Sequence, residues 1–536
     1  SPGMQSLGLS GNAETGYETN GNNFTARGAL TYKAEHYDIE GNVSYRNYGD
    51  YTDGNGDVVP SSFKTFDYSA KLGYNPGENQ RLRLTWRQSF GRDIKHAGLP
   101  MDSPYDDSYL VGLDYRIAVP KSNIRSFMLK LFYSHVDHLM TNEDRPSFMM
   151  TEAESNVFVT PYGGKGELEL TPTEKLSLFV GADANFIGRE GDRIRTIKVM
   201  NGNPLPMPMV KVDKIWQDSK LDDLGVFAEA KLLAQDNSVF TAGIRTDFVN
   251  SSINDPEEDF LELYGGEIEN QQDFNVSGNF SYLVKWNQVQ FQASIGRGVR
   301  SAYLLERYIN HFNVGQDPYE YVGNPYLDPE VNHQIELSSD YRGSRLAFGG
   351  SVFYSFLTNY ITAVIDEDLP RKFMPMQEPR FAKRFVNVDD AVQAGFEVFF
   401  NYYFNDRFSF LSDLSYTYAQ NTDLDEPLPL IAPLTAHFGV KYERSSYWLN
   451  LKSRLVAEQN RVAESFGEAP SPGFVTFDFS AGYQPVEGLS VGAAVLYLFD
   501  TAYYEHLNFS YRNSDLLQGR IYEPGRNFTL YLNYSF

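Results

Sequence analysis

His138 and Met140 are the two side chains of this sequence whose types and spacing best suit metal chemistry. They lie in the stretch FYSHVDHLMTNEDRPSFMM, residues 132–150, which ends on Met149 and Met150. Imidazole and thioether groups are ligands for soft cations, Cu(I) above all. The chain contains no cysteine, which excludes disulfides and thiolate sites. Any soft-metal site built by this chain must therefore use methionine and histidine.

Most other methionines fall in or beside long connections between candidate strands. They are Met101, Met149, Met150, Met200, Met207, Met209, Met374 and Met376. Two segments, PLPMPM (204–209) and FMPM (373–376), repeat methionine at a spacing of two. We expect a copper-capturing surface that joins His138 and Met140 with Met149, Met150, Met207, Met209, Met374 and Met376. The alternative is that these methionines fill irregular gaps where loops pack, a common role for this side chain.

The composition narrows the class of protein. A formal net charge of −24 disfavours nucleic acid as a partner, because such binding depends on lysine and arginine neutralising phosphates, and it favours cations. No stretch approaches 18 consecutive apolar residues, so the sequence predicts no membrane-spanning helix, and no secretory signal is visible. With 536 residues, 15% of them aromatic, the chain could form several soluble domains or one large closed architecture.

Alternation of apolar and polar residues with a period of two runs along the whole chain and predicts β-strands. In QRLRLTWRQSF (80–90), Leu82, Leu84 and Trp86 share one face, and arginine and threonine share the other. LNLKSRL (449–455) repeats the pattern. The candidate strands are mostly about ten to fifteen residues long, whereas strands of soluble proteins average about five to six. This length favours strands that cross a membrane.

Connections between the candidate strands alternate between short and long. The short ones are turns rich in Asn, Asp, Gly, Pro and Ser at residues 75–80, 119–125, 171–175, 234–238, 342–345, 404–407, 444–447 and 484–488. The long ones lie at about residues 49–63, 92–106, 141–157, 189–221, 251–270, 301–330, 365–390 and 502–524. Short periplasmic turns and long extracellular loops are typical of outer-membrane barrels. We therefore predict an all-β fold, a transmembrane antiparallel barrel of 22 strands that forms a single domain over residues 1–536, with both termini at the periplasmic end.

The strand that carries the His-x-Met pair is predicted at about residues 124–140, where Leu131 and Tyr133 take the lipid-facing parity. His138 and Met140 take the other parity, so both should face the lumen near the extracellular mouth, about 7 Å apart along the strand. The same end should hold Met207 and Met374, and the opposite end should hold Asn75, Glu174 and Asp406. The chain closes on NFTLYLNYSF, an alternating strand with a terminal aromatic residue, which resembles the signal read by outer-membrane assembly machinery.

Three segments resemble the barrel of TonB-dependent receptors, the active importers of the outer membrane, in spacing and order. They are GRGVRSAYLLERY (296–308), GNPYLDPEVNHQIELS (323–338) and EPGRNFTLYLNYSF (523–536). Two more segments, RDIKHAGLPMDSPYDDSYLVGLDYR (92–116) and HVDHLM (135–140), resemble the copper-type branch of that family. The resemblance implies that His138 and Met140 are the barrel's share of a copper site. It also implies that a Cys-x-x-x-Met motif on a plug domain supplies the other ligands.

The barrel pattern begins within the first few residues, so we expect no plug domain in this chain, which departs from the family pattern. The resemblance implies a bacterial outer-membrane location, contact with outer-membrane lipids, and coupling to TonB through a plug outside this chain. A surface lipoprotein is a further candidate partner, and no nucleic acid is expected. No cofactor is required, because copper would be cargo.

Three functional hypotheses stay open. The first is a copper importer, and the second is an importer of a siderophore, haem, cobalamin or peptide, for which ERYINHFNVGQDPYEYVGNPY (306–326) could supply aromatic contacts. The third is a plugless passive pore or a structural subunit of an outer-membrane assembly. No Ser-His-Asp ordering stands out, so the sequence predicts no enzyme. His96, His311 and His506 are interpreted as hydrogen-bonded loop residues rather than ligands.

Overall fold

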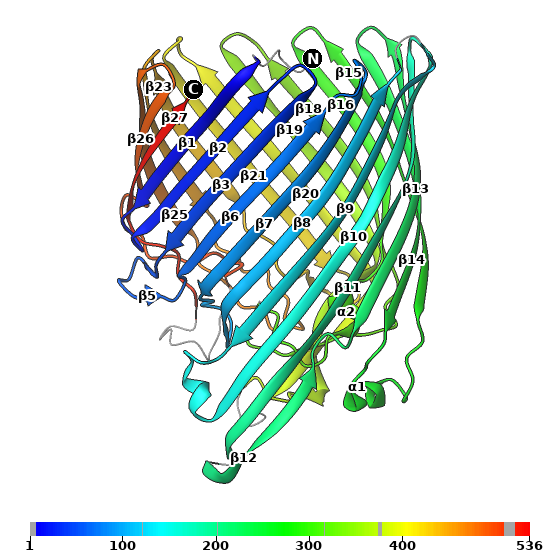
Figure 1. The fold of residues 1–536 in the computed structure, drawn as a ribbon, viewed down its shortest axis with the longest axis vertical. Coiled ribbons are helices and arrows are strands. Elements are labelled where there is room, and N and C mark those ends of the chain that lie inside the picture. Colours follow the sequence, from blue (N-terminus) through cyan, green and yellow to red (C-terminus); the bar gives the residue numbers. More distant parts are fainter. Residues whose placement is uncertain (1–6, 120–121, 201, 316, 374–377, 509–519) are drawn as a thin grey trace.

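The strands form one closed antiparallel β-barrel (Figure 1). The structure is a computed structural model that describes residues 7–119, 122–200, 202–315, 317–373, 378–508 and 520–536. Within these residues 22 strands make the wall, which confirms the predicted fold. The wall strands are β1 (Gly8–Glu18), β2 (Asn23–Lys33), β3 (Tyr37–Tyr48), β6 (Phe63–Tyr74), β7 (Gln80–Ile94), β8 (Asp102–Ala118), β9 (Ile124–Thr141), β10 (Thr151–Thr173), β11 (Leu176–Met200), β13 (Ser219–Gln235), β14 (Ser238–Ile253), β15 (Gln271–Trp286), β16 (Val289–Arg300), β18 (Glu330–Arg342), β19 (Leu346–Pro370), β20 (Phe381–Tyr403), β21 (Phe408–Asn421), β23 (Thr435–Glu443), β24 (Tyr447–Val456), β25 (Phe474–Val486), β26 (Leu489–Leu496) and β27 (Asn527–Ser535).

The connections contain the other elements of the described chain. These are the short strands β4 (Tyr51–Thr52), β5 (Val58–Val59), β12 (Asn203–Lys214), β17 (Tyr321–Val322) and β22 (Glu426–Pro427), the helices α1 (Glu258–Leu263) and α2 (Leu304–Tyr308), and the 3-10 helix η1 (Pro146–Met149). No helix of the described residues is long and apolar enough to cross a membrane.

The barrel closes where β1 pairs with β27, from Asn12–Ser535 to Glu18–Thr529. The start of β1 and the end of β27 lie at the end of the barrel that carries the short turns, and β12 and α1 lie at the opposite end (Figure 1). Asn75, Glu174 and Asp406 fall in the short turns, as predicted. His138 and Met207 lie toward the other end on β9 and β12, whereas Met374 lies outside the described residues.

Apolar side chains that face outward and polar side chains that face the lumen alternate along the wall strands, as the sequence predicts. Leu84, Trp86 and Leu131 are 47%, 40% and 45% exposed, which suits side chains that face lipid. Strand residues of the opposite parity place charged side chains in the lumen, where Lys71 pairs with Glu40 and Arg245 pairs with Asp183. On β27 the apolar face is exposed along its length, at Phe528, Leu530, Leu532 and Tyr534.

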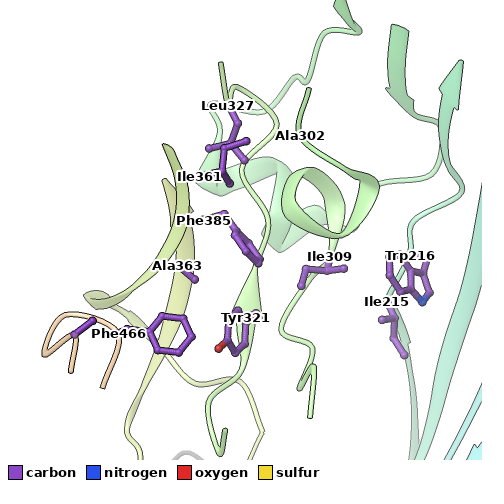
Figure 2. Packing of buried hydrophobic residues seen from close by; sticks show 11 residues of the cluster. Ile215, Trp216, Ala302, Ile309, Tyr321, Leu327, Ile361, Ala363, Phe385 and Phe466 are labelled. Atoms are coloured by element: carbon purple, nitrogen blue, oxygen red, sulfur yellow. The ribbon is translucent and has the colours of Figure 1, made fainter. Parts of the chain in front are cut away.

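The largest buried hydrophobic cluster lies among the extracellular connections rather than in the wall. It is formed by Ile215, Trp216, Ala302, Ile309, Tyr321, Leu327, Ile361, Ala363, Phe385, Ala463 and Phe466. Figure 2 shows how residues of widely separated connections and of the ends of β19 and β20 gather in it. We call the assembly of connections around this cluster the cap. A 22-stranded lumen is too wide for wall side chains to fill, so the apolar core forms in the cap instead.

Residues 189–221, predicted as a long connection, do join two wall strands, but they form a β-hairpin. β11 runs on to Met200, and β12 pairs back along it from Asn203–Met200 to Lys214–Asp192. Pro206 and Pro208 fit this strand because they lie where its register with β11 shifts, between the pairs Ile197–Met209 and Val199–Pro204, and have no partner on β11. Proline is tolerated at strand positions that need no donor toward a neighbour. Met207 and Met209 therefore lie on a strand.

Two further long connections were not among those predicted. Residues 422–434 link β21 to β23, and residues 457–473 link β24 to β25. Ala463 and Phe466 of the second connection contribute to the cap.

Candidate functional site

The His-x-Met pair lies at the extracellular end of β9. His138 is opposite Val157 and Met140 is opposite Ser155 on β10. Both have the parity opposite to Leu131, which is exposed on the outer face. Period-two alternation therefore puts both donors on the lumen side, in agreement with the predicted placement. Their role as metal ligands stays a prediction.

Asp106 on β8 orients the imidazole of His138. The two residues are direct partners across the β8–β9 ladder, and His138 Nδ1 lies 2.9 Å from Asp106 Oδ2. With Nδ1 engaged by a carboxylate, Nε2 is the ring nitrogen that can bind a cation. A carboxylate of this kind fixes the ring and raises its basicity in metal sites. Sequence reasoning missed Asp106, although the strict register of two adjacent strands could have identified it.

His96 lies in the connection between β7 and β8, close to this pair. Burial lowers the pKa of its imidazole, and the carboxylate of Asp102 acts in the opposite direction. Its Nε2 is buried and has no hydrogen-bond partner among the described residues. His96 is hydrogen-bonded through its backbone, since its N–H donates to Asp102 and its carbonyl accepts from Arg145, but this ring nitrogen is not.

A cavity of about 230 Å³ lies beside Met140. Its lining residues are Leu99, Pro100, Met101, Met140, Asn142, Ser147, Thr151, Ala153, Arg193, Arg195, His311, Phe312, Asn313, Val314, Glu320, Arg371 and Phe373. The volume is below the range of about 300–1,000 Å³ typical of clefts that hold organic ligands. Met101 and His311 therefore share a small cavity with Met140, a grouping that the sequence did not predict.

One buried carboxylate closes a wall of this cavity. Glu320, 3% exposed, accepts hydrogen bonds from the backbone N–H groups of Lys372 at 2.8 Å and Phe373 at 3.0 Å. It also lies 2.9 Å from His311 Nδ1 and accepts from Arg371 Nε at 3.3 Å. We call residues 371–373 the strap. Glu320 thus binds the strap and fixes the ring of His311 at the same time.

The strap is also anchored on its other sides. The guanidinium groups of Arg193 and Arg195 lie over the Phe373 ring, 4.7 Å and 4.5 Å from its centroid. Lys372 Nζ lies 2.8 Å from Glu257 and 2.7 Å from Asp259. Burial opposes the charge of Lys372, but these carboxylates hold the pKa of its ammonium above the usual value. The strap therefore ties several extracellular connections to one another.

The remaining predicted methionines lie elsewhere. Met149, Met150 and Met207 are 76%, 45% and 80% exposed, and Met209 is half-buried on β12. The carbonyl of Met150 accepts N–H groups of Lys198 and Val199, which packs η1 against the β11–β12 hairpin. In the described chain these four form an outer group that does not line the cavity. Met374 and Met376 lie outside the described residues.

His311 and His506 are hydrogen-bonded loop residues, as interpreted. His506 lies between Ser471 Oγ, 2.9 Å from Nδ1, and Glu468 Oε1, 3.1 Å from Nε2. A serine, a histidine and a carboxylate thus meet, an arrangement that was not predicted from the sequence. Ser471 and His506 are 4% and 5% exposed, so a substrate has no access to the hydroxyl. The group connects extracellular segments instead.

Hard ligands alone do not form a metal centre in the part of the chain that the structure describes. No group of three or more His, Asp or Glu side chains there could hold a metal ion. This statement concerns histidine and carboxylate ligands only. Thioether sulfurs are the donors that soft cations prefer. A metal site in these residues would therefore depend on methionine together with histidine.

A closed barrel with short turns at one end and a cap of long connections at the other defines the class of outer-membrane transport barrels. The chain belongs to the TonB-dependent receptor family, since residues 93–498 match the family model described as TonB dependent receptor-like, beta-barrel. It is therefore an outer-membrane protein of a family of transporters and receptors.

Solved structures of such receptors share the fold. The copper transporter OprC is 21% identical, with a TM-score of 0.86 over 99% of this chain and 81% of that chain. The FrpB iron transporter from Neisseria meningitidis is 15% identical, with a TM-score of 0.73 over 99% and 83%. The siderophore receptor PirA from Pseudomonas aeruginosa is 16% identical, with a TM-score of 0.63 over 99% and 81%. No curated protein matches the sequence.

Proposed function

We propose that this chain is the barrel of a TonB-dependent importer that captures copper at its extracellular mouth. The observation that carries the proposal is the pairing of His138 and Met140 on the lumen side of β9, with His138 Nδ1 engaged by Asp106. An imidazole nitrogen and a thioether two residues apart can bind one soft cation. Structural similarity to a protein named as a copper transporter supports the same cargo.

The size of one cavity argues against a large organic cargo. The cavity beside Met140 is about 230 Å³, too small for a haem or a cobalamin. In the aromatic segment 306–326, Tyr308 and Tyr321 are 0% and 1% exposed and pack inside the cap, whereas Tyr326 is 47% exposed and is open to stacking contacts. The small cavity supports an ion rather than a siderophore, haem, cobalamin or peptide. Coupling to TonB and a surface lipoprotein partner are part of the same proposal.

Anaerobic calorimetric titration of the purified protein with buffered Cu(I) tests this function. Met140→Leu keeps the side-chain volume and removes the thioether, and His138→Ala removes the imidazole. Each should weaken Cu(I) binding by at least about tenfold, the lower limit seen even for partners outside the ligand shell. Met140→Leu should change stability by less than about 1.5 kcal/mol, as volume-conserving swaps do.

Met128→Leu is the matched control, because Met128 lies on the same strand toward the short-turn end. It should leave Cu(I) affinity unchanged. Wild-type affinity in both Met140→Leu and His138→Ala would refute the copper function and leave the cargo open.

A further inference from the structure

Arg297 and His333 lie side by side on the outer face of the barrel wall, and we call them the basic pair. They are direct partners across the ladder that joins β16 to β18, and both are exposed. The next residues on this face toward the short turns are Ile295 and Ile335, 54% and 53% exposed, as lipid-facing side chains are. Because side chains alternate along a strand, the basic pair projects toward the membrane, whereas Gln292 of β16 projects into the lumen.

The surroundings of the basic pair are apolar. Val299 is opposite Val331 on the extracellular side of it, and Phe356 of β19 is opposite His333. β15, β16 and β18, all of whose residues the structure describes, carry no Asp or Glu on this face. Within the described residues, neither member of the basic pair forms an ion pair. An arginine thus lies on the lipid face without a counter-ion, in a chain whose net charge is −24.

Two other basic side chains of the outer face do have carboxylate partners. Lys64 on β6 pairs with Asp93, and Arg92 on β7 pairs with Asp107. Both have the parity of the lipid-facing residues of their strands, and both lie at the extracellular end. The basic pair therefore needs an anion from another molecule for the same compensation.

Arg297 lies near the outer edge of the apolar band of the wall. It is eight residues beyond Val289, the first residue of β16 after the short turn. At about 3.4 Å per residue and a strand tilt of about 40°, this is a rise of about 20 Å, against an apolar band about 25 Å tall. Its Nη1 donates to the carbonyl of Val276, which lies two residues nearer to the extracellular end of β15 than Gly278, its ladder partner. The guanidinium therefore reaches toward the headgroups, as long basic side chains do in membranes.

Phosphate groups of lipid headgroups are anions available at this level of a membrane. A guanidinium binds phosphate oxygens through two parallel N–H bonds, and Nε and Nη2 of Arg297 remain for such a contact. The imidazole of His333 can donate a further hydrogen bond from the neighbouring strand. There is space beside Arg297, because a Cβ added at Gly278 would have one described neighbour within 4 Å, the carbonyl oxygen of Gly243.

We propose that Arg297 and His333 bind one phosphate group of a lipid headgroup in the outer leaflet. Arg297 supplies the charge and a two-point contact, and His333 supplies one hydrogen bond. Ile295 and Ile335 contact the acyl chains of the same lipid. The site holds one anionic lipid on the β16–β18 side of the barrel. It is independent of the copper function, because it lies on the outer face rather than in the lumen.

Native mass spectrometry of the detergent-purified protein tests the proposal, with dioleoyl phosphatidic acid as the probe and dioleoyl phosphatidylcholine as the neutral comparison. The wild-type protein should bind phosphatidic acid more tightly than phosphatidylcholine. Arg297→Gln should weaken binding of phosphatidic acid by about tenfold or more, as expected for the loss of hydrogen bonds to a charged group. His333→Leu should weaken it by about threefold, as expected for a single hydrogen bond.

Arg83→Gln is the matched control, because Arg83 is an exposed arginine of β7 whose parity is opposite to that of the lipid-facing Leu84. It should keep the wild-type affinity for phosphatidic acid. Circular dichroism and heat-dependent migration in gels show that each variant is a folded barrel.

Four results would overturn the proposal. One is equal affinity of the wild-type and Arg297→Gln proteins for phosphatidic acid. Another is an equal loss in Arg83→Gln, which would make the effect one of net charge. Displacement of phosphatidic acid by inorganic phosphate at comparable concentration would assign the site to a free anion. A wild-type dimer that Arg297→Gln converts to a monomer would assign the basic pair to a contact between two copies of the chain.

Discussion

Replacing Glu320 with alanine should release the strap from the cavity wall. In the wild-type protein the Glu320 carboxylate is 3% exposed and binds two backbone N–H groups, one guanidinium and one imidazole. Alanine offers none of these acceptors. The N–H groups of Lys372 and Phe373 and the side chain of Arg371 would then be left unpaired in a buried place.

The size of the effect follows from these contacts. An unsatisfied buried donor costs about 1–3 kcal/mol, and removing one partner of a buried ion pair costs about 3–5 kcal/mol. Because the Phe373 ring keeps its contacts with Arg193 and Arg195, we take the lower figure of about 3 kcal/mol. At 1.4 kcal/mol for each factor of ten, this corresponds to about 150-fold faster opening.

Hydrogen exchange of the purified protein, followed by mass spectrometry of peptides that contain the strap, measures this opening. Glu378→Ala is the matched control, because Glu378 belongs to the same connection and pairs with Arg380 at the surface, where their side chains are 58% and 70% exposed. An exposed pair of this kind contributes about 0–1 kcal/mol. The control should therefore exchange nearly as the wild-type protein does.

Peptides from β1 to β3 supply an internal reference, because the barrel wall does not depend on Glu320. An increase of less than about fivefold in the strap, similar in both variants, would refute the reasoning. The strap would then be held by the aromatic contact of Phe373 and the carboxylates around Lys372 rather than by Glu320.

Further predictions concern the carboxylate of Asp106, Lys372 of the strap, the effect of low pH, and the lipid-facing side of β27. Asp106→Asn should weaken Cu(I) binding by about 10–100-fold in calorimetry. Lys372→Met should destabilise the cap by about 3 kcal/mol, measured as faster proteolysis of the extracellular connections, because it leaves Glu257 without its cation. Burial disfavours the charge of Asp259, but Lys372 holds the pKa of this carboxyl below its usual value. The stabilisation that the charged Asp259 gives the strap is complete above about pH 4. It is lost as the pH falls through the lowered pKa of Asp259, so hydrogen exchange in the strap should rise only in acid. Leu530→Arg should cost about 2–4 kcal/mol at the lipid face in urea unfolding from vesicles, whereas Asn533→Arg, of lumen parity, should not.

The wall could be predicted from sequence because its pattern is local. Leu84 and Trp86 alternate with polar residues, and every second pair of adjacent strands is joined by a turn of a few residues. The lumen side of His138 follows from the same parity. Asp106 was within reach as well, since it lies opposite His138 across a single ladder.

The cavity could not be predicted in this way. Met101 and His311 line the same cavity because Leu99 packs against Gly315 and because cap residues such as Tyr321 and Phe385 bury one another. No periodic pattern encodes a contact between two irregular segments so far apart in sequence. The β11–β12 hairpin was missed for a different reason, since its three prolines are typical of loops and fit a strand only at an edge or where the pairing is irregular.

The junction of β1 and β27 differs from every other line in the barrel wall. Adjacent wall strands are otherwise neighbours in sequence, but here Asn12 meets Ser535, about 520 positions later. Closing a loop of that size costs about 4 kcal/mol more chain entropy than closing a five-residue hairpin. The pairing is also shorter than that of β1 with β2, which uses the whole of β1. A curved, open sheet is therefore the natural precursor of the closed barrel.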